Sequence, residues 1–177
     1  SAAAWARVAP PGEVSSVLSL ADLRAGWLET GRKALPGTPS ALEFHALAQT
    51  LAKAEREGLS ALQARHASAA RAARAGARVL TGRAWVAPEQ ASTLVTAVAL
   101  PEGMAAAQVL AVAEPGHGLS AGVGPEGERL IRLNHTGVRA RRAVVLEDLA
   151  VLTRALGRLG HRVDPGAVLF AASGAGA

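Results

Sequence analysis

Apolar residues recur at every third or fourth position in the first half of the chain, and this spacing predicts amphipathic helices. The clearest stretch runs from Ser40 to about Arg56, and Ser40 and Glu43 have the spacing of a capping box. Gly58 interrupts the pattern before an Ala-rich helical continuation to about Ala75. The apolar positions of the first stretch are Phe44, Leu47, Leu51 and Ala54. The two stretches predict a long helical arm that Gly58 can kink.

Two shorter helices are predicted before this arm, at 2–8 and 21–29. Pro10, Pro11 and Gly12 end the first one, because proline cannot continue a helix. The segment 31–40 is rich in proline and glycine, which predicts a loop with an extended, fixed backbone.

Beyond Gly76 the pattern changes to β-branched, strand-like runs. Strands are predicted at 78–86, 93–100, 119–122 and 129–133, and helices at 104–112 and 142–159. This order of elements predicts a small α/β domain, in which helices pack on one face of a sheet. Gly76 is therefore the predicted boundary between residues 1–75, which hold the connecting helices, and a small carboxyl-terminal domain, residues 76–177.

The chain has 177 residues, of which 50% are hydrophobic, and a net charge of +5. A basic surface can indicate nucleic-acid binding. Here the arginines are scattered through Ala-rich helices, and the few aromatic residues do not alternate with them as a base-stacking surface needs. The chain has no cysteine and no run of eighteen or more apolar residues. We expect a cytoplasmic protein with neither a nucleic-acid nor a membrane partner.

The glycine-rich segment Gly122–Gly127 has the spacing G-x-G-x-x-G of a dinucleotide-binding turn. Such a turn opens a helix, whereas this one contains Pro125 and is followed by a strand pattern. We therefore interpret it as a hairpin turn. The histidines show no metal-ligand spacing, and no G-x-S-x-G nucleophile elbow is present, so neither a metal site nor an isolated hydrolase is expected.

Arg132 lies inside the apolar strand pattern of Leu130–Leu133. A guanidinium in an apolar strand loses hydration unless an anion meets it, and its planar fork suits a carboxylate. The alternative is an edge-strand arginine that faces water, and the local pattern alone favours this second interpretation.

Several segments together resemble the class V aminotransferases, which include the alanine–glyoxylate, serine–glyoxylate and pyridoxamine–pyruvate enzymes. Gly122–Gly124 followed by Leu130–Gly137 resembles the glycine turn and R-I-G-H-M-G segment of that family. Ser92–Val98 is similar to its S-x-T-V-T-A-V strand. Pro36–Ser40 and Glu57–Leu59 are similar to its T-P loop and to the E-x-G-L end of its long helix. These segments occur in the family's order and span most of the chain.

The resemblance implies the carboxyl-terminal part of a fold-type-I enzyme that depends on pyridoxal phosphate. In that fold a large domain holds the cofactor, a small domain follows, and active sites lie at the interface of an oligomer, so that residues 1–75 would end the large domain. Arg132 matches the arginine that binds the substrate carboxylate. Thr38, with the backbone of Gly37, matches the contact to the cofactor phosphate across the interface. Arg141 falls where the pyridoxamine–pyruvate branch has a second arginine for the keto acid.

Two departures from the family pattern are visible. The lysine that binds the cofactor covalently belongs upstream of residue 1, and neither Lys33 nor Lys53 fits its place. Leu35 stands where several relatives have a tyrosine that touches the phosphate. No catalytic residue is therefore expected in this chain.

These features lead to the hypothesis of an aminotransferase portion that works with an amino-terminal partner chain carrying the lysine. It would transfer an amino group between a small amino acid and a keto acid. One alternative is a non-catalytic interaction or regulatory subunit derived from this fold. Another is a lyase using the same cofactor, because a fold does not determine the reaction.

Overall fold

The structure is a computed structural model that describes residues 2–8, 19–33, 40–82 and 85–175. The chain divides into two compact units, Ser1–Arg56 and Glu57–Ala177. The division into domains 1–75 and 76–177 concerns the assembled fold, and it stays a prediction.

Short helices make up the described beginning of the first unit, α1 (Ala2–Trp5) and α2 (Leu20–Leu23), and a π-helical turn (Arg24–Leu28) continues α2. Ser19 caps α2, because its hydroxyl accepts a hydrogen bond from the backbone N–H of Asp22 at 3.2 Å. The guanidinium of Arg24 lies 5.3 Å from the centre of the Trp5 ring, which is a cation–π contact. The predicted helices at 2–8 and 21–29 are thus confirmed in shorter form.

Helix α3 (Ala41–Glu57) is the predicted amphipathic stretch. The hydroxyl of Ser40 accepts a hydrogen bond from the backbone N–H of Glu43 at 3.4 Å, which is one half of the predicted capping box. No residue of α3 is buried. The large apolar side chains exposed along it are Leu42, Phe44, Leu47 and Leu51.

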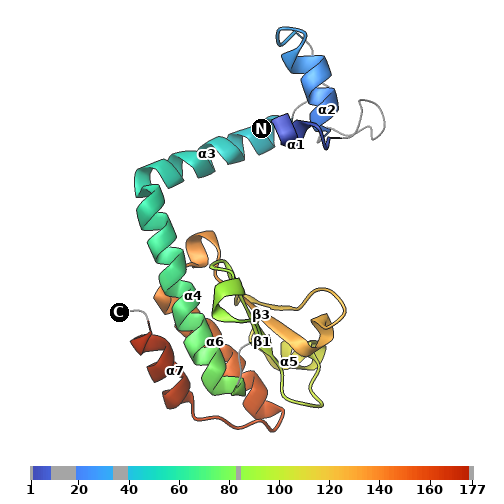
Figure 1. The fold of residues 1–177 in the computed structure, drawn as a ribbon. Coiled ribbons are helices and arrows are strands. Elements are labelled where there is room, and N and C mark those ends of the chain that lie inside the picture. The colour runs from blue at the N-terminus through green and yellow to red at the C-terminus, as the bar shows by residue number, and fades with distance from the viewer. Residues whose placement is uncertain (1, 9–18, 34–39, 83–84, 176–177) are drawn as a thin grey trace. The chain divides into compact units, whose positions relative to one another are not determined.

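The second unit begins with helix α4 (Leu59–Thr81), and Gly58 separates it from α3 as predicted. Its three strands are β1 (Val95–Ala99), β2 (Leu119–Ala121) and β3 (Leu130–Asn134). They form one antiparallel sheet in the order β1-β3-β2. The other helices are α5 (Ala106–Val112), α6 (Arg142–Arg158) and α7 (Pro165–Gly174). Figure 1 shows α4, α6 and α7 gathered beside the sheet.

The core of this unit lies between one sheet face and the helices. Val98, Ile131 and Leu133 project from the sheet, and α6 contributes its apolar stripe. Helix α4 contributes mainly alanines, which allow the helices to approach closely. A Cβ added at Gly76 would lie 2.5 Å from the side chain of Leu149 in α6, so a larger residue there would displace that leucine.

The structure corrects the predicted strand at 78–86. Helix α4 continues to Thr81 and ends at Gly82, whose φ of 72° is the left-handed conformation that ends many helices. The sequence pattern was misleading because the adjacent apolar residues Val79 and Leu80, the first of them β-branched, are typical of a strand. Leu80 instead continues the buried face of Ala73 and Ala77 at helical spacing.

Helix α7 was not predicted, because its residues are almost all apolar and show no helical period. Its start is nevertheless marked by Asp164, whose carboxylate accepts hydrogen bonds from the N–H groups of Gly166 and Ala167, and by Pro165 in the first turn.

The glycine turn behaved as predicted, since Gly122–Gly127 connects the antiparallel strands β2 and β3.

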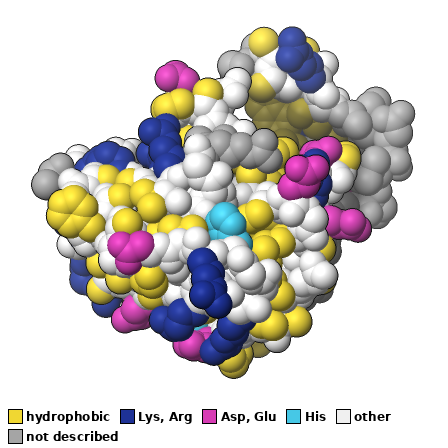
Figure 2. Space-filling model, turned by 90° about the horizontal axis from the view of Figure 1, so that it is seen from below, with side chains coloured by type: hydrophobic (Ala, Val, Ile, Leu, Met, Phe, Trp, Pro, Cys, Tyr) yellow, Lys and Arg dark blue, Asp and Glu magenta, His cyan; other side chains and the backbone are white. Residues whose placement is uncertain are grey.

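Within the described ranges, no helix is both long and apolar enough to cross a membrane. Figure 2 shows one face, on which arginine and lysine side chains are interspersed with apolar and acidic ones.

Candidate functional site

Arg132 lies in the middle of β3, on the sheet face that the core does not use. Its neighbours Ile131 and Leu133 are buried in the core, while Arg132 is half-buried on the opposite side. Ala97 of β1 and Ser120 of β2 stand directly beside it in register. We call this side the open sheet face, and its half-buried residues are Val95, Ala97, Ser120, Arg132 and Asn134.

The guanidinium of Arg132 makes no hydrogen bond or ion pair with any residue that the structure describes. Its two flanking residues in register, Ala97 and Ser120, are small. Asn134 is used differently, because its amide donates to the hydroxyl of Ser120 at 2.9 Å and to the carbonyl of Gly118 at 3.1 Å. An unpaired, half-buried guanidinium beside small residues is a suitable receptor for a carboxylate.

Beyond β3 the chain forms a turn, residues 135–140, which we call the β3–α6 turn. Arg141, the second predicted substrate arginine, is exposed and occupies the N-cap of α6 directly after it. Arg132 and Arg141 share no hydrogen bond, but this turn connects them. The predicted phosphate contacts Gly37 and Thr38 lie outside the described residues, as does Leu35.

Helix α4 holds the β3–α6 turn from one side. The Nε2 atom of His66 accepts a hydrogen bond from the backbone N–H of Gly137 at 3.1 Å. The Nη1 atom of Arg65 donates to the carbonyls of Gly137 at 2.6 Å and Ala140 at 3.2 Å. Glu57 pairs with Arg65, whose Nη2 donates to Glu57 Oε2 at 2.8 Å. We call Glu57, Arg65 and His66 the α4 clamp.

The α4 clamp connects two of the sequence motifs. Glu57 begins the segment Glu57–Leu59, and Gly137 ends the segment Leu130–Gly137, so the two motifs meet through Arg65. The hydrogen bond from Arg65 is the main cause that lowers the pKa of Glu57, and Arg141 lowers it further by its charge. Glu57 therefore stays ionised next to two arginines.

Helix α6 holds the same turn from the other side. The Nη2 atom of Arg139 donates to both carboxylate oxygens of Asp148, at 2.7 and 2.9 Å. Asp148 also accepts from the backbone N–H of Gly118 at 3.0 Å, and Nδ1 of His117 lies 3.4 Å from the same oxygen. A Cβ at Gly118 would lie 2.6 Å from Asp148, so only glycine leaves room for this ion pair.

His135, at the start of the turn, is buried and uncharged near neutral pH. Its Nε2 atom lies 2.9 Å from the hydroxyl of Thr96, and its Nδ1 atom has no partner among the described residues. Burial lowers the pKa of His135 to about 4. Its role is to fill the core beside β1.

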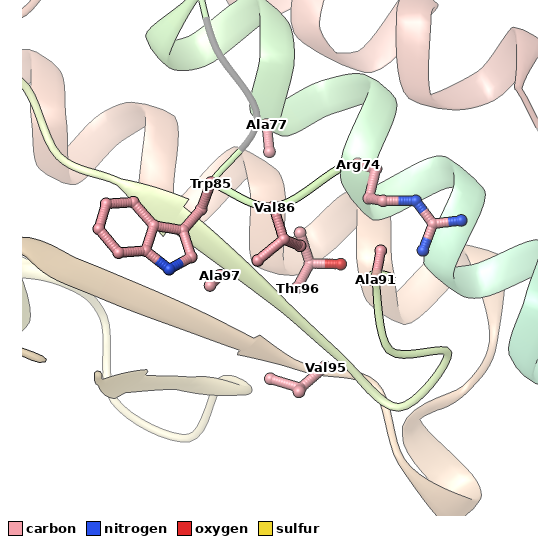
Figure 3. A pocket seen from close by; sticks show the side chains of 8 residues that line it. All are labelled: Arg74, Ala77, Trp85, Val86, Ala91, Val95, Thr96 and Ala97. Carbon is pink, nitrogen blue, oxygen red and sulfur yellow. The ribbon is translucent and has the colours of Figure 1, made fainter. Parts of the chain in front are cut away.

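A small pocket lies against the edge strand β1, and Figure 3 shows the side chains that line it. Arg74 and Ala77 reach it from α4, and Trp85 and Val86 from the segment after that helix. Burial is the largest cause that lowers the pKa of Arg74, and its Nη1 donates to the carbonyl of Ser92 at 3.3 Å. The pocket is mostly apolar, and Arg132 is not among its lining residues.

The comparisons with known proteins concern the whole chain. It is 32% identical over 174 residues to the pyridoxamine–pyruvate transaminase of Mesorhizobium japonicum, covering 96% of this chain and 44% of that protein. The structure of pyridoxamine–pyruvate aminotransferase from Mesorhizobium loti superposes with a TM-score of 0.83 at 31% identity, over 99% of this chain and 45% of that one. This chain has the fold of the carboxyl-terminal part of a class V aminotransferase.

A second solved aminotransferase supports the same conclusion. Ureidoglycine–glyoxylate aminotransferase from Bacillus subtilis superposes with a TM-score of 0.74 at 25% identity, over 92% of this chain and 42% of that chain. No known family profile matches the chain. The chain spans less than half the length of these aminotransferases. Pyridoxal phosphate is the cofactor of class V aminotransferases, as the sequence motifs imply.

Metal ligands and lysines are the other groups that bear on the chemistry of this chain. Among them, no set of three or more His, Cys, Asp or Glu side chains is placed to bind a metal ion. Lys33 and Lys53, the lysines of this chain, are both exposed. Arg132 is a half-buried cation whose guanidinium has no partner among the described residues.

Sequence reasoning missed the α4 clamp and the Arg139–Asp148 pair. By sequence alone, Arg65 is one of several arginines scattered along Ala-rich helices, and His66 is one of five histidines without metal-ligand spacing. Their partners lie 71 and 72 residues away in the sequence, so no local pattern reveals them. The only available signal was the presence of two adjacent polar side chains, Arg65 and His66, in a helix that otherwise buries alanines.

Proposed function

We propose that this chain forms the substrate-binding part of an aminotransferase that moves an amino group between a small amino acid and a keto acid. The observation that carries the proposal is the unpaired guanidinium of Arg132 on the open sheet face, in a chain with the class V aminotransferase fold. Both substrate types contain a carboxylate, which is the anion that a planar guanidinium fork binds best.

Arg132 binds the substrate carboxylate through two parallel hydrogen bonds. The position of Arg132 within β3, rather than on a loop, keeps its backbone fixed while substrates exchange. Ala97 and Ser120, its small neighbours in register, leave room for a carboxylate and favour compact substrates. The role of Arg132 is therefore to orient the substrate, not to transfer protons.

Arg141 provides a second cation for the keto acid. It is exposed in the described structure and has no hydrogen-bonded side-chain partner there, although Glu57 lies within the range of its charge. We assign it a weaker role than Arg132. An exposed arginine is already hydrated, so binding an anion there contributes little free energy.

The cofactor site is shared with the rest of the fold. We propose that Thr38 and the backbone of Gly37 contact the phosphate of pyridoxal phosphate, which supplies an electron sink for the amino-acid carbon when bound. The lysine that holds the cofactor is supplied from outside this chain, by an amino-terminal partner in an oligomer whose active sites lie at the interface.

The exposed apolar side chains of α3 support such a partner. Phe44, Leu47 and Leu51 recur at helical spacing and are 62%, 53% and 55% exposed. A contiguous apolar stripe of this kind on a soluble protein marks a contact surface. We propose that the large domain of the aminotransferase covers it.

The test of this function is the variant Arg132→Lys in the assembled enzyme, with Arg129→Lys as matched control. Lysine keeps the charge but loses the two-pronged geometry, so substrate binding should weaken by about 1 to 3 kcal/mol, the value of a charge-assisted hydrogen bond. Arg129 is an exposed arginine just before β3 and should tolerate the change. Steady-state kinetics of amino transfer measure the effect. Unaltered kinetics in Arg132→Lys would make Arg132 a surface arginine and remove the basis of the proposal.

A further inference from the structure

The β3–α6 turn sets the position of Arg141 and anchors the end of the strand that holds Arg132. It begins just after the strand that contains Arg132 and ends at Arg141, so a shift of its backbone would move Arg141 directly and would loosen the end of β3. Within it, Gly137 adopts a φ of 55° and Val138 is 74% exposed, so the turn gains little stability from burial at its tip. Its conformation therefore depends on contacts from neighbouring helices.

His66 makes one of these contacts with a defined protonation state. Its Nε2 atom accepts from the N–H of Gly137 through its lone pair, so the imidazole is the tautomer with its hydrogen on Nδ1. That assignment agrees with the 2.8 Å separation of Nδ1 from the carbonyl of Leu62, to which Nδ1 donates. His66 is 8% exposed, and its ring is held at both nitrogens.

Arg65 makes the other contacts, and Glu57 orients it. The carboxylate of Glu57 receives hydrogen bonds from Nε and Nη2 of Arg65, which leaves Nη1 pointing at the carbonyls of Gly137 and Ala140. Both side chains of this ion pair are partly exposed, at 27% and 30%, so the pair itself adds little stability. What it provides is a fixed direction for the guanidinium.

We propose that Arg65 and His66 are positioning residues of the substrate site, which hold the β3–α6 turn so that Arg132 and Arg141 face the substrate carboxylate together. They touch neither substrate nor cofactor. The inference rests on the proposed function, because it assigns a task to the two arginines. It predicts that loosening the turn lowers substrate affinity more than it lowers the rate of the bound complex.

The test uses the assembled enzyme with the variants His66→Leu, His66→Gln and Arg65→Met. Leucine removes the acceptor for the Gly137 N–H, whereas the carboxamide oxygen of glutamine can replace Nε2. Arg78→Met is the control, since Arg78 is an exposed arginine on the same helix and makes no contact with the turn. The quantities measured are kcat, KM for pyruvate as the keto acid, and its Kd by calorimetry.

We expect His66→Leu and Arg65→Met to raise KM and Kd about three- to tenfold, the effect of one net hydrogen bond, with kcat nearly unchanged. His66→Gln and Arg78→Met should behave like the wild type. If His66→Leu does not fold, Arg65→Met still tests the inference, because the Arg65 side chain is partly exposed and its loss should be tolerated by the fold. Wild-type KM and Kd in Arg65→Met, or equal impairment by leucine and glutamine at residue 66, would overturn the inference.

The same measurements separate this inference from the proposed function. A wild-type enzyme that binds pyruvate but transfers no amino group contradicts the proposed function alone, and Kd then decides the role of the α4 clamp. A wild-type enzyme that binds neither pyruvate nor glyoxylate contradicts both.

Discussion

The ion pair of Arg139 and Asp148 predicts that losing Arg139 destabilises the protein more than losing Asp148 does. Asp148 is 2% exposed, whereas the Arg139 side chain is 32% exposed. Removing the arginine leaves a carboxylate in the interior with the N–H of Gly118 and the ring of His117 as its remaining neighbours. Removing the aspartate leaves a guanidinium that can turn toward water. The two single variants should therefore differ, although they break the same ion pair.

The magnitude follows from burial. Loss of one partner of a buried ion pair costs about 3 to 5 kcal/mol, which is the value expected for Arg139→Met. Asp148→Leu leaves a partly hydrated cation and the backbone N–H of Gly118 without their acceptor, but no buried charge, so it should cost about 1 to 3 kcal/mol. The expected difference in the free energy of unfolding is about 2 kcal/mol.

Urea denaturation of the assembled protein, monitored by circular dichroism, measures both values. Arg154→Met is the control, because Arg154 and Glu114 form an ion pair in which the side chains are 48% and 46% exposed. That variant should change stability by less than about 1 kcal/mol. The reasoning fails if Asp148→Leu destabilises the protein as much as Arg139→Met does.

Two further predictions concern stability. Burial lowers the pKa of His135 to about 4, below its unfolded value of about 6.5. The unfolded state therefore binds the proton first, and the free energy of unfolding should fall by roughly 3 kcal/mol as the pH drops from about 6.5 to about 4. A His135→Gln variant that keeps this whole pH dependence would contradict the prediction. Gly76→Ala brings a Cβ within 2.5 Å of Leu149; overpacking of about 1 to 3 kcal/mol should outweigh the helix propensity gained, and a rise in Tm would refute it.

The elements that the sequence predicted well are those with a strong internal period. Helices α3 and α6 and strands β1 and β3 have apolar residues at regular spacing, because each has one apolar face, which is buried or, in α3, exposed. The strand predicted at 78–86 was wrong, since Leu80 belongs to a helix whose buried face is made of alanine and glycine and therefore has little hydrophobic contrast. Helix α7 was missed for the same lack of contrast.

The sequence named Arg132 and Arg141 as candidate site residues, whose roles stay predictions, but it did not show their surroundings. Local pattern favoured a solvent-facing Arg132, and only the register with Ala97 and Ser120 shows that it is half-buried beside small residues. The contacts of Arg65 and His66 with Gly137 join segments far apart in the sequence, so they depend on tertiary structure. The roles of Gly37 and Thr38 stay predictions, because both lie outside the described residues.

The central claim is that this chain binds substrate while the lysine that holds pyridoxal phosphate lies elsewhere in the assembled enzyme. Borohydride reduction of that enzyme fixes the cofactor to the lysine that holds it, and peptide mass spectrometry then identifies the residue. We expect the label on one lysine outside these 177 residues and none on Lys33 or Lys53. Stoichiometric labelling of Lys33 or Lys53 would contradict the claim, and an assembly that binds no cofactor and labels no lysine would instead be a non-catalytic derivative of the fold.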